Sequence, residues 1–402
     1  MSASFTTRGS TALRRAVLGA CAAVSTLFLA ACDPAAMGGA SSGPATGQMI
    51  TPGQPVRLAL LVPGGTGSAD LDWLARSLRN SARMAAADAP SGTIDLRVYD
   101  AGNAPAMAVA QANAAADAGA QIILGPLFAD STNAVGSAMM ARNINVLSLS
   151  NNSQVAGGNV FTLGTDFDTV ADRLVRYGVS QGKRNFLVVA EDDVAGQLGG
   201  RAIEAAIARA NARIAARLNH PVSISGIDAA APRIAQAATS GQVDAIFMTA
   251  NNQAVLPYLT ERLAGSGVSA RTVQMMGLTR WDQPADRLRM PQLAGGWFAL
   301  PDQALMSQFE ARYTQAYGEA PHPLAFLAYD GTAAIASLAR SGRRDALTTT
   351  GLTQPAGFAG VGGVFRFNRD GTSSRALAIA TIRDGRVVII DPAPRSSRGL
   401  GS

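Results

Sequence analysis

The sequence predicts an α/β protein with two lobes that face each other across a central cleft. From Pro55 onward, short β-branched or aliphatic runs alternate with alanine-rich helical stretches. This alternation favours parallel strand–helix–strand units with helices on both faces of a sheet. The same pattern begins again near Asp168. Together the two runs hold more units than one sheet usually needs, so we expect two α/β lobes.

The first run supplies the first lobe. We expect strands over Val56–Val62, Ile94–Tyr99, Gln121–Leu124 and Val146–Leu149, and helices over Leu71–Ala89, Ala106–Ala118 and Thr132–Arg142. The first strand is a continuous apolar run, which is typical of a strand buried on both faces. The first helix carries its apolar residues at helical spacing.

The second run is longer and ends differently. We expect helices over Asp168–Gln181, Gly199–Ala210, Ile234–Ser240 and Ala254–Ala264, and strands over Asn185–Val189, Val222–Ser225, Ala245–Thr249 and Val273–Met276. A crossover strand over Gly296–Leu300 precedes two helices, Met306–Tyr317 and Leu324–Ala339. The last strands are Gly363–Phe367, Ala376–Ile382 and Val387–Ile390. Asp-Gly pairs join them, which indicates hairpins.

The amino-terminal segment is typical of a bacterial export signal. Three arginines precede an apolar run that ends in Leu29-Ala30-Ala31-Cys32, and this end resembles the lipobox of bacterial lipoproteins. The resemblance implies cleavage after residue 31, lipidation of Cys32 and a periplasmic protein tethered to the inner or outer membrane. The alternatives are a cleaved signal with an incidental cysteine, or an uncleaved anchor, although the run is shorter than the ~20 residues that span a bilayer. Residues 32–54 are rich in small and turn-forming residues and predict a flexible linker.

Composition argues against several function classes. The formal net charge is +6, but the arginines are scattered among acids, so we expect no nucleic-acid binding. The two histidines, His220 and His322, lie in unrelated segments, and neither cysteine falls after Cys32. Metal sites and Ser-His catalysis need clustered ligands or a nearby base. We therefore expect no metal, no cofactor and no enzymatic activity.

The loops that follow the strands are the predicted ligand site, because open α/β sheets bind ligands beyond the carboxyl ends of their strands. These loops are rich in Gly, Ser, Asn and Thr, which suits a small polar or anionic ligand. The same residues are also ordinary turn and cap formers. Glu191-Asp192-Asp193 is either a solvated loop or a site for a cation or amine. Trp281 either lines the cleft or packs at the lobe surface, and Arg280 is a candidate partner for a carboxylate.

Several motifs in order resemble the type I periplasmic-binding fold, in its leucine/isoleucine/valine-binding branch. They are Leu58–Pro63, Ile123–Leu127, Val146–Asn151, Ser180–Arg184, Gly362–Asn368 and Asp370-Gly371. The resemblance covers nearly all of residues 55–392. Within the branch it is greatest to the penicillin-binding-protein activator lipoproteins of Alphaproteobacteria.

The resemblance implies two Rossmann-like lobes with three hinge crossovers, near Gly164, Gly295 and Ser341. Lobe 1 would comprise residues 55–163 and 296–341, and lobe 2 residues 164–295 and 342–392. Residues 393–402 would form a disordered tail. The domain therefore follows a signal peptide, residues 1–31, and the linker.

The resemblance also implies the ligand contacts. Receptors of this branch hold an amino acid's carboxylate with hydroxyl and N–H groups of two first-lobe loops, which correspond to residues 129–132 and 150–152. The implied cleft residues are Ser131, Thr132, Ser150, Asn152, Asn251, Asn252, Thr279, Arg280 and Trp281. The family's covering aromatic falls at Asn251 or Asn252. Its ammonium-binding acid falls near Thr279, with Asp282 as the nearest carboxylate. A buried ammonium without an acid partner is costly, so we expect weak binding of branched-chain amino acids.

Two functions follow from the resemblance. The first is a non-enzymatic periplasmic lipoprotein that activates peptidoglycan synthesis by binding a class A penicillin-binding protein. The alternative is the substrate-binding protein of an ABC importer for amino acids or similar small polar solutes, which would bind an ABC permease. For the first function we expect an exposed contact around Trp281 and Arg280, and a Trp281→Ala protein that binds more weakly without unfolding.

Overall fold

The computed structural model describes residues 46–250 and 255–400. The predicted signal peptide, Cys32 and the first part of the predicted linker lie outside these ranges, as do Asn251 and Asn252. The described residues form one compact unit. Among the described residues, no helix combines the length and the apolar character that crossing a membrane requires.

The first lobe is built on a five-stranded parallel sheet with the order β2-β1-β3-β4-β5. Its strands are β1 (Val56–Val62), β2 (Ile94–Asp100), β3 (Ile122–Leu124), β4 (Asn145–Ser148) and β5 (Val160–Thr162), and its first helices are α1 (Ala69–Asp88), α2 (Pro105–Asp117) and α3 (Ala129–Met140). Successive residues of β1 enter different cores: Leu58 and Leu60 pack in the core under α1, and Ala59 and Leu61 under α2 and α3. Burial on both faces explains the continuous apolar run.

The second lobe is built on a seven-stranded sheet with the order β15-β14-β10-β9-β8-β6-β7. The parallel strands are β6 (Asn185–Glu191), β7 (Arg213–His220), β8 (Ala245–Met248), β9 (Gln274–Gly277) and β10 (Trp297–Leu300); β14 (Ala378–Arg383) and β15 (Arg386–Asp391) add an antiparallel hairpin. Helices α4 (Phe167–Ser180) and α5 (Val194–Arg209) cover one face, and α6 (Ile224–Ala238) and α7 (Val255–Gly265) cover the other.

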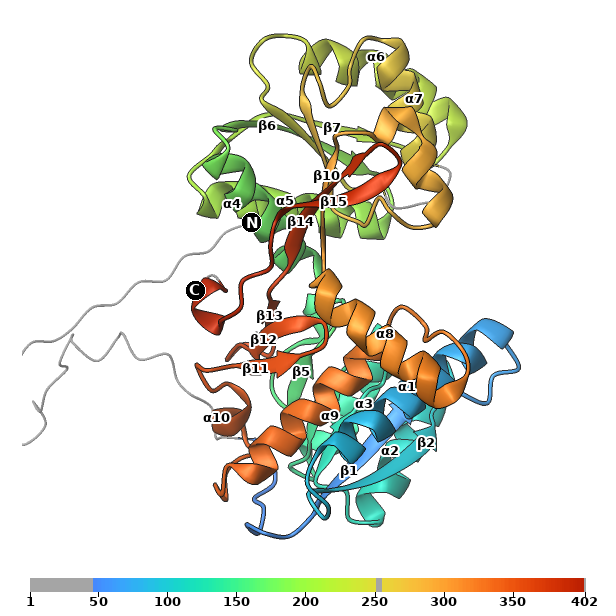
Figure 1. Ribbon diagram of the computed structural model, residues 1–402, viewed down its shortest axis with the longest axis vertical. Coiled ribbons are helices and arrows are strands. Elements are labelled where there is room, and N and C mark those ends of the chain that lie inside the picture. The colour runs from blue at the N-terminus through green and yellow to red at the C-terminus, as the bar shows by residue number, and fades with distance from the viewer. Residues whose placement is uncertain (1–45, 251–254, 401–402) are drawn as a thin grey trace, which may run out of the picture. The chain divides into compact units, whose positions relative to one another are not determined.

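Segments far along the chain complete the first lobe. They are α8 (Gln303–Tyr317), α9 (Ala325–Arg340), α10 (Thr349–Leu352) and a small antiparallel sheet of β11 (Phe358–Gly360), β12 (Gly363–Phe367) and β13 (Ser373–Arg375). Figure 1 shows α9, in orange, beside the blue α1. Phe358, Phe365 and Phe367 belong to the same core as Leu58 and Leu60 of β1.

The structure corrects the predicted lobe boundaries. Residues 297–300 form β10, which pairs with β9 and β14 and so belongs to the second lobe. Residues 349–375 pack mainly on the first lobe, because their aromatic side chains fill its core. The chain therefore passes between the lobes at residues 163–166, 301–302 and 376–377. The first of these segments contains Gly164, whereas the predicted crossovers near Gly295 and Ser341 do not match the second and third segments.

One strand was predicted in the wrong place. Val222–Ser225 is not a strand: Ser223 caps α6, accepting a hydrogen bond from the Gly226 N–H, and the strand before it is β7. β7 lies at the edge of its sheet and pairs with β6 alone. Its exposed side chains interrupt the apolar pattern, so its sequence does not read as a buried strand. The three-residue strands β5, β11 and β13 were not predicted.

Both ends of the described chain are held to the body, contrary to the predicted linker and tail. The backbone N–H of Gly47 donates to Asn143 Oδ1 at 2.9 Å, and the Ile50 side chain is buried in the first-lobe core. At the other end, Ser397 Oγ donates to the Pro355 carbonyl at 3.0 Å, and Leu400 is buried in a second-lobe core. A disordered stretch would have no such fixed partners, so the linker cannot extend to residue 54, nor can the tail begin at residue 393.

Candidate functional site

A chain of hydrogen bonds joins the two first-lobe loops that carry predicted ligand contacts. Thr132 Oγ1 lies 2.7 Å from Ser148 Oγ, whose oxygen also accepts from the Ser150 N–H at 3.1 Å. Ser150 Oγ in turn accepts from the Asn152 N–H at 3.1 Å. Ser148 is the central member of this chain. It was not among the predicted ligand contacts, because it is the last residue of β4 and its sequence context is that of a buried strand.

Ser131 occupies the first turn of α3 beside this chain. Its side chain is buried, and its hydroxyl has no hydrogen-bond partner among the described residues. The N-cap of α3 is Phe128, so no side chain caps the first N–H groups of the helix. Buried hydroxyls in proteins are nearly always partnered, and an uncapped helix start favours an anion. This end of α3 is therefore suited to accept a carboxylate.

The predicted second-lobe contacts lie after β9. Thr279 is half-buried and donates from Oγ1 to the Ala250 carbonyl at 3.3 Å. Arg280 donates two hydrogen bonds to the Asp282 carboxylate, from Nε at 3.0 Å and from Nη2 at 2.6 Å. The Asp282 carboxylate is consequently engaged by Arg280, and both residues are poorly placed to serve the carboxylate or ammonium of a ligand.

Trp281 is not the exposed residue that we expected. Its side chain is fully buried within the second-lobe core. A Cβ atom on Gly277 would lie 1.8 Å from the indole Nε1, and one on Gly296 would lie 2.0 Å from Cζ3. The two glycines create the space that the indole fills, so the predicted contact surface around Trp281 does not exist.

Two buried polar residues, Glu191 and His220, end the neighbouring strands β6 and β7. They are direct partners in the strand register, and both side chains are buried. The Glu191 N–H donates to Thr249 Oγ1 at 3.0 Å, which ties the end of β6 to the loop after β8. The pair was missed because β7 was not recognised as a strand.

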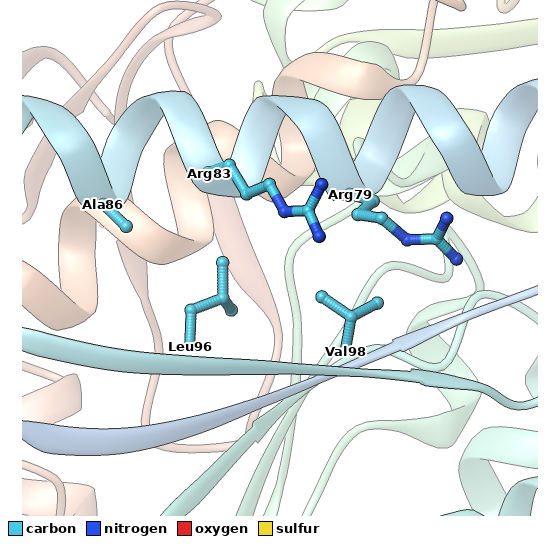
Figure 2. Close-up of a pocket in the computed structure, with 5 residues that line it drawn as sticks. All are labelled: Arg79, Arg83, Ala86, Leu96 and Val98. Carbon is cyan, nitrogen blue, oxygen red and sulfur yellow. The ribbon is translucent and has the colours of Figure 1, made fainter.

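A separate groove lies on the outer edge of the first lobe (Figure 2). It encloses about 410 Å³ between α1 and the edge strand β2, and Arg79 and Arg83 extend from the helix over Leu96 and Val98. Arg79 pairs with Asp100 at 2.9 Å. The floor of the groove lies in the middle of β2, so it is distinct from the loops at the carboxyl ends of the strands.

Asp166 is a buried acid in the first crossover. It caps α4 by accepting the Thr169 N–H at 2.8 Å, and its side chain is about 2% exposed. Burial raises the pKa of Asp166 to about 6, and the nearby charges of Asp168 and Asp370 act in the same direction. At any pH at which Asp166 is ionised in the native state, its negative charge therefore destabilises the fold.

This raised pKa predicts a pH-dependent cost to stability. The native protein binds the Asp166 proton more tightly than the unfolded chain, so the stabilisation is complete below about pH 4 and is lost as the pH rises through about 6. Asn caps helices as well as Asp does, so Asp166→Asn should raise the free energy of unfolding by about 2–3 kcal/mol at neutral pH, and by progressively less toward pH 4. Urea titrations across this range measure the difference, and a gain that does not change with pH would contradict it.

These features define a two-lobed binding protein with a polar first-lobe site. No group of three or more His, Cys, Asp or Glu side chains is placed to hold a metal ion within residues 46–250 and 255–400. The chain belongs to the periplasmic binding protein family, whose model matches residues 55–386. That family consists of proteins that bind ligands and typically lack enzymatic activity, and it places the chain in the periplasm.

Solved structures with the same fold include three informative ones. A Rhodospirillum rubrum protein assigned to a branched-chain amino acid ABC transporter has 17% identity and a TM-score of 0.70, over 84% of this chain and 100% of that one. A Desulfitobacterium hafniense ABC transporter substrate-binding protein in complex with Leu has 18% identity and a TM-score of 0.63, over 84% and 100%. An R. palustris solute-binding protein in complex with benzoate has 14% identity and a TM-score of 0.56, over 85% and 97%. A comparison with curated proteins gave no match.

Proposed function

We propose that this protein is the substrate-binding component of an ABC importer and that it captures a small solute through a carboxylate group. The observation that carries the proposal is the buried hydroxyl of Ser131 at the start of α3, which has no hydrogen-bond partner within residues 46–250 and 255–400. An incoming carboxylate would accept hydrogen bonds from this hydroxyl and from the first N–H groups of the helix. The partner of the loaded protein would be an ABC permease.

The structural relatives support a carboxylate ligand. Leucine and benzoate, which are bound by two of them, share a carboxylate and differ in nearly everything else. Benzoate has no ammonium group, and in this chain Asp282, the acid nearest to the expected ammonium site, is engaged by Arg280. We infer that the carboxylate is the recognised group and that an α-ammonium is not required.

No observation supports the first of the two expected functions, the activation of a class A penicillin-binding protein. Its proposed contact depended on an exposed tryptophan, and Trp281 is buried. The importer is therefore the preferred function. We retain lipid attachment at Cys32 as a proposal, on the basis of the Leu29–Cys32 motif; mass spectrometry of the mature amino terminus would detect the acylated cysteine.

The proposal predicts a carboxylate-dependent rise in thermal stability. Benzoate and leucine, as probes, should raise the melting temperature more than benzamide and leucinamide, because only the acids carry the recognised charge. Benzoate should bind at least as well as leucine. In Ser131→Ala, the affinity for the better acid should fall about 10-fold to 100-fold, which is the effect of losing one hydrogen bond to a charged group.

Ser137→Ala is the matched control. Ser137 lies on the same helix, is exposed and donates to the Asn133 carbonyl within the helix, so its removal should leave affinity unchanged. Equal stabilisation by acids and amides, or an unchanged affinity in Ser131→Ala, would contradict the carboxylate site. Normal uptake of every tested carboxylate in a strain that lacks the gene would contradict the importer.

A further inference from the structure

A second cavity lies where the first and third crossovers meet. It encloses about 520 Å³ and is lined by the first turns of α4, the turn between β12 and β13, and residues Ser153 and Gln154. None of the predicted ligand contacts of the two lobes lines it. Its size falls within the range of small-molecule sites.

Hydrogen bonds hold the walls of this cavity in place. Thr169 Oγ1 donates to the Ser373 carbonyl at 3.2 Å, and Arg173 Nε donates to the Leu377 carbonyl at 2.7 Å. Arg173 also forms an ion pair with Asp391 at the end of β15. These bonds connect helix α4 to the third crossover and fix the backbone segments that carry the side chains around the cavity.

One end of the cavity is acidic. Asp166, Asp168 and Asp370 all line it. Asp168 accepts from Ser153 Oγ at 3.2 Å, and Asp370 accepts from the Thr372 N–H at 2.9 Å. None of the three carboxylates has an ion-pair partner among the residues that the structure describes. All three carboxylates belong to residues that line the same end of one cavity, so a ligand at this end would meet all of them.

The other end of the cavity is basic. Arg176 and Arg209 both pair with the one carboxylate of Asp172, at 2.7 Å and 2.9 Å. Two guanidinium groups that share one carboxylate leave a net positive charge at this end. The cavity is therefore dipolar, with unneutralised negative charge and unneutralised positive charge lining one space.

The separation of these ends sets the size of the ligand. Asp168 and Arg176 lie on the same helix, eight residues apart, which corresponds to about 12 Å along its axis. The Arg176 side chain leans back toward the helix start and shortens this span. An extended chain covers about 3.3–3.6 Å per residue, so the termini of a di- or tripeptide would reach both ends, and those of a single amino acid would not.

We propose that this cavity binds a short zwitterionic peptide, with its ammonium at Asp166, Asp168 and Asp370 and its carboxylate at Arg176 and Arg209. The site does not depend on the first-lobe carboxylate site, because the two share no residue. A peptide in this cavity would contact residues before and after both the first and the third crossover.

Calorimetry with trialanine tests the proposal. Trialanine should bind, and N-acetyl-trialanine and trialanine amide should each bind at least 10-fold more weakly, because each lacks one of the two charges. Asp370→Asn and Arg209→Gln should each weaken trialanine binding by a similar factor. Arg343→Gln, in an exposed ion pair with Asp345, is the matched control and should leave binding unchanged.

Three results would overturn this site. They are an absence of trialanine binding at millimolar concentration, equal binding of the blocked peptides, and unchanged binding in both Asp370→Asn and Arg209→Gln. Ser131→Ala separates this proposal from the proposed function: it should weaken binding of the acid probes and leave trialanine binding intact. A loss of trialanine binding in Ser131→Ala would place the peptide in the first-lobe site and would also overturn the proposal.

Discussion

Replacing Arg375 by methionine should lower the free energy of unfolding by about 3–5 kcal/mol, because it leaves a buried carboxylate without its counter-charge. Arg375 forms an ion pair with Asp330 in which both side chains are almost completely buried. The Arg375 guanidinium carbon lies 5.2 Å from the ring centroid of Phe326 and 4.8 Å from that of Phe365. The pair joins α9 to β13 at the third crossover.

The loss in Arg375→Met should depend on pH in a defined direction. Burial raises the pKa of Asp330, and the charge of Arg375 opposes this effect. Without Arg375 the pKa of Asp330 should rise further, so the buried acid takes up a proton more readily. The destabilisation should therefore be largest at high pH and should diminish as the pH falls.

Denaturant unfolding of two further variants completes this test. Arg343→Met breaks the exposed pair with Asp345 and should leave the free energy of unfolding nearly unchanged. The double variant Asp330→Leu/Arg375→Met should recover much of the stability, because it leaves no buried charge. A single Arg375→Met variant as stable as Arg343→Met would show that the buried pair does not stabilise the fold.

Replacing Trp281 by alanine should cost about 3–5 kcal/mol of folding free energy, through a cavity in the second-lobe core. Because the indole is buried, Trp281→Ala should act on folding and not on a surface contact. Gly277→Ala should also destabilise the protein, because its Cβ would lie within 1.8 Å of the indole.

Trp73→Ala is the matched control for the lost indole. Trp73 is half-buried and packs edge-on against His322, with ring centroids 4.7 Å apart. Its removal should cost less than that of Trp281, because part of its surface is already in contact with water. Urea titrations of the two variants compare the costs directly, and a Trp281→Ala protein as stable as Trp73→Ala would contradict the core assignment.

The pattern of apolar residues was sufficient to predict most of the helices and strands. β1 was predicted with its observed limits, and most of the longer helices were predicted to within a few residues, because buried strands and amphipathic helices have local signatures. β7 was not predicted because three of its eight residues are exposed at the sheet edge and only His220 is buried. The strands β5, β11 and β13 were not predicted because three residues without a continuous apolar run show no period.

The sequence was sufficient for the fold class and for the loops that carry the first-lobe site. Strand–helix alternation is a local property, and ligand sites of such sheets lie after the strands. Which residues in those loops are free to bind depends on how each loop folds and on what packs against it, and neither can be read from the sequence pattern. Asp282 is engaged by Arg280, and Trp281 is buried between Gly277 and Gly296. The Ser131 hydroxyl has no hydrogen-bond partner in the part of the chain that the structure describes.

Only the tertiary structure decided how the lobes are composed and where the charged cavity lies. β10 joins the second sheet, while α9 and β12 complete the first core, because each apolar face is buried where a complementary face is available. Asp166, Arg209 and Asp370 are far apart in the sequence and line one space. Their combined field arises from the packing of the crossovers, and no local pattern in the chain encodes it.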